Sequence, residues 1–254
     1  CAETIMEKAD LVTTTTKPLK KVLEKFNKNV VIVENAIDKE FFKCFEKNKD
    51  KLPVVIYSGS ATHWKDMLTI LPSLYKVKKE IPFIFVLLGF CQSPIESTMY
   101  EYSKLVKWGG ENVLTNFQKT ALECWDYLRK MDIIHFPFYT PELYPIMISK
   151  INANIGLCPV EDIEFNKSKS AIKFYEYASC GMATLAPALL PYKDEVDYTY
   201  TDANDFEDKL KKLLQDYDFI KEVATRQREW VLNNREIKII IPKWEKAYLD
   251  ILNK

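Results

Sequence analysis

The sequence is poor in glycine. Only six of its 254 residues are glycine, roughly 2% where about 7% is usual. Phosphate-binding loops of the G-x-G-x-x-G and P-loop types need several closely spaced glycines, because the backbone itself approaches the phosphate. The six glycines are placed so that neither pattern can be written. A nucleotide bound by this chain must therefore be held in another way.

Histidine is rarer still, and the cysteines form no metal-binding pattern. The chain has two histidines and six cysteines, and no two cysteines are spaced as C-x-x-C. Zinc sites need such clusters of thiolates and imidazoles. We therefore expect no metal site and no cofactor, and we expect the cysteines to be buried free thiols in a reducing compartment.

An excess of either charge is also missing. Because 36 Lys and Arg side chains balance 36 Asp and Glu side chains, no net field attracts a polyanion, and nucleic acid is not expected as a partner. No apolar run reaches the ~18 residues of a membrane span, and the first residues form no signal peptide. We expect a cytoplasmic protein, either free or peripheral to the inner face of the membrane. The chain begins at Cys1 rather than Met, which indicates a processed start or a piece of a longer protein.

The apolar residues fall into short runs separated by stretches of helical period. This alternation is typical of an α/β fold, a parallel sheet with helices on both faces. Each run is nearly continuous in Val, Ile, Leu or Phe, so each is expected to be a strand buried on both faces. The predicted strands are residues 30–33, 54–57, 83–88, 133–136, 155–158 and 183–186.

Helices are expected between and after these strands. Pro72 marks a kink or a boundary within the first of them, because proline lacks the N–H that its turn needs. Residues 91–120 are expected to be an insertion. Residues 30–203 should form one α/β domain, preceded by a lead-in at 1–29 and followed by a helical tail at 204–254. The predicted helices are residues 66–79, 121–130, 143–150, 170–179, 204–214, 220–232 and a last one through 244–252.

The most informative segment follows the predicted strand 155–158. It reads Phe165-Asn166-Lys167-Ser168-Lys169-Ser170-Ala171-Ile172-Lys173-Phe174-Tyr175-Glu176-Tyr177. We expect a loop entering a helix that is capped by Ser168 or Ser170 and ends at Gly181. Three lysines crowd its start, where the helix dipole disfavours each cation by about 0.3–1 kcal/mol. An anion held there by backbone N–H groups, serine hydroxyls and lysines would compensate for this cost.

The spacing within this segment adds a carboxylate to the predicted anion site. Lys169, Lys173 and Glu176 stand at i, i+4 and i+7, so they share one helix face, with Glu176 roughly 10 Å from Lys169 at about 1.5 Å per residue. This arrangement suits a phosphate at the helix start and a ribose diol that donates to the carboxylate. The alternative is a solvated lysine face with one i, i+3 ion pair.

A second segment joins the strand 54–57 to the next helix. The strand ends in Ser58-Gly59-Ser60, and Lys65 follows shortly after. In an open α/β sheet, ligands bind at the carboxyl ends of the strands. Gly59 and Ser60 would let a ligand approach the backbone, and Lys65 could reach a phosphate.

Together these segments resemble the nucleotide-sugar-binding, C-terminal half of the retaining GT-B glycosyltransferases of group 1. Residues 165–181 resemble the subgroup pattern F-N-x-x-K-S-x-x-K-x-x-E-Y-A-x-x-G, and residues 57–65 resemble the strand, turn and lysine that hold the donor diphosphate. Residues 9–13 and 31–38 resemble the passage between the two domains of that family. The resemblance implies a Rossmann-like parallel sheet flanked by helices, one half of a GT-B fold, with residues 1–29 as a remnant or linker of a missing N-terminal acceptor domain.

The resemblance also implies roles for single residues. Glu176 matches the second Glu of the E-x7-E motif, which binds the donor ribose, and Ser168 stands where the first Glu would contact the donor sugar. His63 is assigned to the donor sugar, and His135 and Phe136 to the nucleobase side, with a structural hydrogen bond as the alternative for each histidine. The diphosphate is assigned to Gly59, Ser60, Lys65, Lys169, Ser170, Lys173 and the backbone at Ala171 and Ile172.

No residue matches a catalytic role, and no metal is implied. Asp216-Tyr217-Asp218 spells the D-x-D of metal-dependent glycosyltransferases, but it lies between polar helices and is expected to be unrelated. The implied reaction transfers a hexosyl or deoxyhexosyl group from a nucleotide diphosphate sugar to a glycan or lipid-linked acceptor, in polysaccharide biosynthesis. Two alternatives are a binding-only module or subunit of a split glycosyltransferase, and a GT-B-shaped epimerase. The Lys and Ser of the donor loop argue against the epimerase, which would use carboxylates and a histidine.

Overall fold

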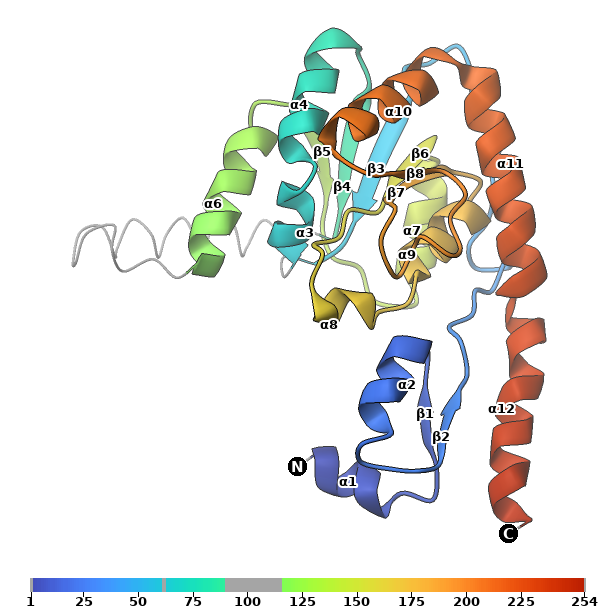
Figure 1. Ribbon diagram of the computed structural model, residues 1–254. Helices are drawn as coiled ribbons and strands as arrows, with labels where there is room; N and C mark the ends of the chain where they lie inside the picture. The colour runs from blue at the N-terminus through green and yellow to red at the C-terminus, as the bar shows by residue number, and fades with distance from the viewer. Residues whose placement is uncertain (1, 61–62, 90–115, 254) are drawn as a thin grey trace.

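The computed structural model describes residues 2–60, 63–89 and 116–253 (Figure 1). The predicted insertion at 91–120 lies outside these residues up to Asn116, where helix α6 begins. Within the described residues, no helix is long and apolar enough to cross a membrane.

A six-stranded parallel sheet forms the centre of the fold. Its strand order is β5-β4-β3-β6-β7-β8, and every pair of neighbours is parallel. The sheet confirms five of the predicted strands. A sixth, β8, has only two residues, too few for an apolar run to show in the sequence. The strands are β3 Val54–Ser58, β4 Ile84–Leu88, β5 Ile133–Phe136, β6 Ile155–Leu157, β7 Ala183–Pro187 and β8 Thr199–Tyr200.

The predicted strand at 30–33 exists, but it does not belong to this sheet. As β2 (Val30–Ile32) it pairs in parallel with β1 (Val12–Thr14) in a separate two-stranded sheet. Helices α1 (Ala2–Lys8) and α2 (Lys17–Leu23) complete this small unit, which lies below the large sheet in Figure 1. An apolar run predicts a strand but not its partner, and the partner here is a short polar stretch joined to β2 through α2.

Helices cover both faces of the large sheet, because its side chains alternate between two cores. Val55 and Tyr57 enter one core and Ile56 enters the other. The first core is covered by α3 (Trp64–Leu68), α4 (Leu71–Glu80), α6 (Asn116–Leu128) and α10 (Ala203–Gln215). The second is covered by α7 (Tyr144–Ile151) and α9 (Ile172–Ser179), and α11 (Tyr217–Asn234) reaches both.

Two further helices complete the described fold. The short α8 (Glu164–Lys167) precedes α9, and α12 (Ile237–Leu252) runs beside the small N-terminal unit (Figure 1). Lys243 of α12 forms an ion pair with Glu34 at 2.7 Å. Pro72 lies in the first turn of α4, where its missing N–H has no partner to lose. The predicted boundary at this proline is thereby confirmed.

Gly156 in β6 lets helix α9 pack tightly on the sheet. A Cβ atom at this position would lie 2.3 Å from Cδ2 of Tyr177, so only glycine leaves room for the ring. The Tyr177 hydroxyl then accepts a hydrogen bond from the Ser58 N–H at 2.7 Å. The missing side chain at Gly156 thus places α9 against the ends of two central strands.

Gly156→Ala is expected to lower the free energy of unfolding by about 1–3 kcal/mol, the usual cost of overpacking a core. Urea denaturation of the wild type and the variant would measure it. In a Tyr177→Ala background the ring is gone. There, adding Gly156→Ala should lower the free energy of unfolding by less than about 0.5 kcal/mol. An equal cost in both backgrounds would contradict this packing argument.

Candidate functional site

The strand order reverses direction between β3 and β6. The chain leaves β3 toward the first core through α3, and it leaves β6 toward the second core through α9. A crevice forms where such connections diverge, at the carboxyl ends of the two strands. The segment after β3 holds Gly59 and Ser60, and the segment after β6 leads to Lys169, Lys173 and Glu176. Both predicted motifs therefore meet at one edge of the sheet.

Helix α9 begins later than predicted and lacks the predicted cap. Its N-cap is Ala171, and no side chain caps it. Ser168 instead ends α8, and the Ser170 hydroxyl accepts a hydrogen bond from Asn35 Nδ2 at 2.6 Å. Lys169 therefore precedes the helix, and the predicted shared face is wrong for it. Gly181, at φ +72°, ends the helix as predicted.

Glu176 is a partly buried carboxyl group that is linked by hydrogen bonds to the end of β3. The Tyr144 hydroxyl donates to its Oε2 at 2.8 Å and lies 2.9 Å from Ser58 Oγ. Burial raises the pKa of Glu176 to about 7, against the opposing effects of the Tyr144 hydrogen bond and the charge of Lys173. Its Oε1 has no hydrogen-bond partner within the described residues, so it can accept from a ligand hydroxyl.

Lys173 is a partly buried ammonium that forms no ion pair within the described residues. Its Nζ lies 5.4 Å above the centre of the Tyr57 ring, and burial lowers its pKa. Across the described ranges no hydrogen bond or ion pair reaches this Nζ. Removing a charge from water without an ion-pair partner is costly, so Lys173 is a candidate to bind a ligand of opposite charge.

Asp66 joins the two segments, and sequence reasoning missed it. Its Oδ1 accepts from the Glu161 N–H at 2.8 Å and from Asn166 Nδ2 at 3.0 Å. Its Oδ2 lies 2.8 Å from His63 Nδ1 and 3.9 Å from Lys169 Nζ. Burial alone would raise the pKa of Asp66, but these partners outweigh burial and lower it. The only hint in the sequence was a carboxylate beside Lys65.

The remaining predicted residues differ in how they lie. Lys169 and His63 are both held by Asp66, so His63 makes the structural contact that was its alternative. The Ser168 hydroxyl donates to Glu164 O within its own helix, at 3.3 Å. Lys65 is exposed on α3, and no contact within the described residues joins it to Lys173 or Glu176. Ser60 is exposed at the end of the β3 turn.

His135 and Phe136 lie on β5, two strands away from β3. Phe136 packs against the second core. Burial lowers the pKa of His135, and its Nε2 is buried without a hydrogen-bond partner in the described part of the chain. The alternative prediction for His135, a structural hydrogen bond, is therefore not seen at Nε2 among the described residues.

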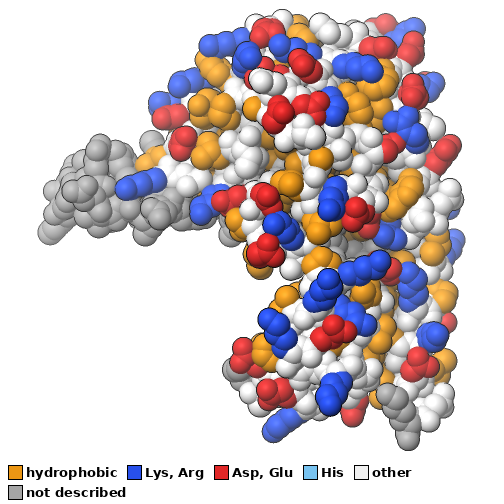
Figure 2. Space-filling view, viewed as in Figure 1, with side chains coloured by type: hydrophobic (Ala, Val, Ile, Leu, Met, Phe, Trp, Pro, Cys, Tyr) orange, Lys and Arg blue, Asp and Glu red, His pale blue; other side chains and the backbone are white. Residues whose placement is uncertain are grey.

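Surface charge and cysteines complete the comparison with the predictions. On the face in Figure 2, acidic and basic side chains are interspersed over the upper part of the molecule, in keeping with the balanced composition. Cys124, Cys158 and Cys180 are buried free thiols as predicted, but Cys44 is exposed, which corrects the prediction for that residue. Cys1 and Cys91 lie outside the described residues.

Solved structures share this architecture. A sucrose-phosphate synthase from Thermosynechococcus elongatus matches over 99% of this chain and 61% of its own, with a TM-score of 0.69 and 17% identity. Anabaena Alr3699/HepE, solved with UDP-glucose, matches over 98% of this chain and 66% of its own, with a TM-score of 0.69 and 10% identity. The fold is one half of a GT-B fold.

A third solved structure is a separate C-terminal domain. The C-terminal domain of a group 1 glycosyl transferase (LpcC) from Francisella tularensis matches over 99% of its length and 79% of this chain, with a TM-score of 0.51 and 17% identity. The chain thus spans less than two thirds of the length of the sucrose-phosphate synthase and of HepE, whereas it matches nearly all of the LpcC domain. The sequence matches no protein-family model and no curated protein.

Glu176 is expected to make stability fall as the pH rises. Its pKa is about 7 in the folded chain, against an ordinary 4.5, so the folded state keeps a proton that the unfolded chain loses. The contribution of Glu176 to the free energy of unfolding is full below pH 4.5 and declines as the pH rises to 7. The decline amounts to about 3 kcal/mol, at ~1.36 kcal/mol per pKa unit. Denaturation of the wild type and Glu176→Gln should show the variant gaining relative stability across this window. A gap that is constant with pH would contradict the raised pKa.

Asp66→Asn should destabilise the fold by about 1–3 kcal/mol, because four cationic or polar partners lose a charged acceptor. The control is Asp162→Asn in the loop before α8, whose exposed carboxylate pairs with Lys167 at 3.2 Å. Its loss should lower the free energy of unfolding by less than about 0.5 kcal/mol. Thermal and urea unfolding would compare the two. Equal effects would show that Asp66 does not join the segments.

Proposed function

We propose that this chain is the donor-binding domain of a glycosyltransferase that binds a nucleotide diphosphate sugar between β3 and β6. The observation that carries the proposal is Lys173, a partly buried ammonium that forms no ion pair within the described residues and lies beside a helix N-terminus at the reversal of the strand order. Helix N-termini present free N–H groups to anions. A diphosphate is a ligand whose negative charge can contact the Lys173 ammonium and the N–H groups at the start of α9 at the same time.

Glu176 supplies a contact that a nucleotide can use and a lone phosphate cannot. It lies one turn beyond Lys173 on α9, and its Oε1 is open to a donor. A ribose diol can donate to this carboxylate while the diphosphate contacts Lys173 and the N–H groups of Ile172 and Lys173. The buried hydroxyls of Tyr144 and Tyr177 keep the carboxylate in place, because they link it to the Ser58 end of β3.

The proposed reaction breaks the bond between the sugar anomeric carbon and the diphosphate oxygen, and forms a bond from that carbon to an acceptor oxygen. The products are the glycoside, the nucleoside diphosphate and the proton of the acceptor hydroxyl. Lys173 and the α9 N–H groups would stabilise the charge that develops on the leaving diphosphate. We propose that these groups act in place of a divalent metal ion.

The broader proposal follows the motif resemblance. In that proposal, a retaining enzyme transfers a hexosyl or deoxyhexosyl group to a glycan or lipid-linked acceptor, and an acceptor-binding domain completes the cleft. The reaction belongs to cytoplasmic polysaccharide biosynthesis.

One observation favours a second candidate, a module that binds the donor without turnover. Ser168 replaces a sugar-contacting carboxylate, and its hydroxyl is directed to its own helix.

Nucleotide binding tests the site. Titration calorimetry with UDP, GDP and dTDP in the presence of EDTA should detect at least one ligand with micromolar to millimolar affinity. Glu176→Ala and Lys173→Met should each weaken binding at least about tenfold, or ~1.4 kcal/mol. The matched control is Lys167→Met, since Lys167 belongs to the same motif but pairs with Asp162 and Glu164.

The outcomes separate the proposal from its competitors. Absence of binding by every nucleotide would reject both the transferase and the binding module. Binding that survives both Glu176→Ala and Lys173→Met would place the ligand elsewhere. Donor hydrolysis or transfer, with and without an acceptor domain, would then distinguish the enzyme from the silent module.

A further inference from the structure

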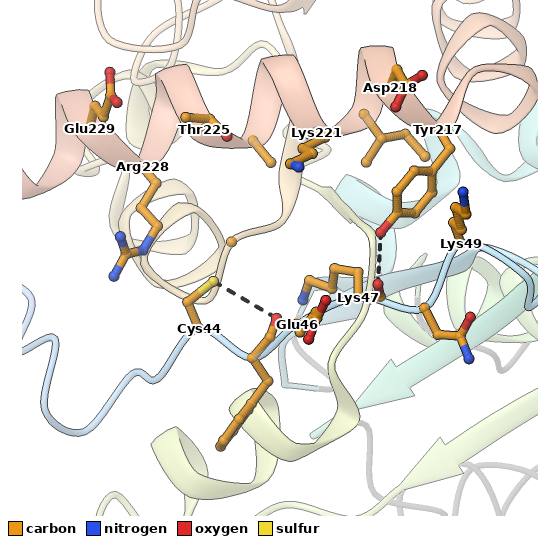
Figure 3. Close-up of a pocket in the computed structure, with 15 residues that line it drawn as sticks. Cys44, Glu46, Lys47, Lys49, Tyr217, Asp218, Lys221, Thr225, Arg228 and Glu229 are labelled. Atoms are coloured by element: carbon orange, nitrogen blue, oxygen red, sulfur yellow. Dashed lines mark hydrogen bonds between the residues drawn. The ribbon is translucent and has the colours of Figure 1, made fainter.

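A pocket of about 860 Å³ lies at the other edge of the sheet from the candidate site (Figure 3). One wall is the loop 44–49, which precedes β3, and the other is formed by residues 217–229 of α11. Its floor includes Gly181, where α9 ends and the chain enters the amino end of β7. Pockets of roughly 300–1,000 Å³ are typical of small-molecule sites.

Three cations face this pocket. Lys221 and Arg228 are two turns apart on α11, so they lie on one helix face. Figure 3 shows the Arg228 side chain directed toward the loop, and Lys221 and Lys47 belong to the lining of the same pocket. Within the described residues, none of the three forms an ion pair with a carboxylate. Cations gathered without counterions attract an anionic ligand.

The acidic residues of the pocket lining differ in whether their carboxylates point toward these three cations. The carboxylates of Asp218 and Glu229 point away from the loop in Figure 3. Glu46 lies next to Lys47 in the loop and is the one acidic side chain of the lining on that wall. The lining also contains Lys49. Positive charge therefore dominates the space between the walls.

Lys47 connects the pocket to two helices of the candidate site. Its Nζ donates to Asn152 Oδ1 at 2.6 Å and to Cys180 O at 3.2 Å. Asn152 and Cys180 are the C-caps of α7 and α9, the helices that carry Tyr144 and Glu176. An ammonium has three N–H donors, so one remains for a ligand. Burial lowers the pKa of Lys47 to about 8, and a bound anion would favour its charged form.

The rest of the lining suits a compact organic group. Ile220, Ala224 and Phe45 supply apolar surface, and the Tyr217 hydroxyl donates to Lys47 O at 2.9 Å, which holds the loop against α11. We propose that this pocket is a second ligand site, which binds a small phosphate monoester with its phosphate between Lys221, Arg228 and Lys47. The proposal is independent of the donor site.

Inorganic phosphate is the probe for this site. Amide chemical shifts would be followed by NMR during a phosphate titration, with chloride at matched ionic strength as the reference. Saturable shifts are expected in residues 44–49 and in α11 up to Glu229. The double variant Lys221→Met/Arg228→Gln should weaken the apparent affinity at least about tenfold, because two charge-assisted contacts are lost. Lys47 is left intact in this variant because it also donates hydrogen bonds to Asn152 and Cys180 at the ends of α7 and α9.

Two single variants sharpen the test. Glu46→Gln removes the acidic charge of the loop and should tighten phosphate binding roughly threefold. Glu229→Gln removes a carboxylate that points away and should leave the affinity unchanged. Glu176→Ala should also leave it unchanged, which separates this site from the proposed donor site.

Three results would overturn the proposal. The first is the absence of saturable shifts in the loop and α11. The second is an unchanged affinity in the double variant. The third is a response confined to residues 58–60 and 168–176, which would assign the phosphate to the donor site and leave the proposed function standing.

Discussion

The packing of Tyr177 into the space left by Gly156 holds the candidate site together. The ring lies where a side chain on β6 would be, and the hydroxyl accepts from the backbone of β3. Helix α9 is therefore fixed against both central strands at the point where the strand order reverses. The position of every α9 side chain at this edge, Lys173 and Glu176 included, depends on that contact.

Burial gives these two side chains their chemistry. Removing a charge from water disfavours the charged form, so the same surroundings lower the pKa of Lys173 and raise that of Glu176. The two groups lie close enough to favour each other's charge, yet desolvation dominates for both. An anion beside Lys173 and hydroxyl donors beside Glu176 would stabilise the charged forms of both side chains.

Much of the fold could be predicted, because its signals are local. The strands β3, β4, β6 and β7 are nearly continuous apolar runs, and Pro72 and Gly181 mark helix boundaries through their own backbone chemistry. The start of α9 could not be predicted in the same way. Ser170 bonds to Asn35, which is distant in the sequence, so its hydroxyl is not free to cap the helix.

The same reasoning explains which parts of the site were missed. Lys169, Lys173 and Glu176 could be selected from one short motif, but Asp66 collects partners from segments about a hundred residues away. Lys65, which the motif favoured, is exposed, whereas its neighbour Asp66 is buried. Which of two adjacent residues faces the interior depends on the packing of α3.

By itself, the sequence determined the α/β class, the central strands and the two segments that meet at their ends, because apolar runs, proline and glycine act on the chain locally. Tertiary structure alone decided that β2 leaves the main sheet, that Asp66 joins the segments, and that Glu176 and Lys173 are desolvated. It also decided that three cations face a pocket at the far edge. Strand partners, burial and the convergence of charges depend on contacts between distant segments, and these arise only when the chain folds.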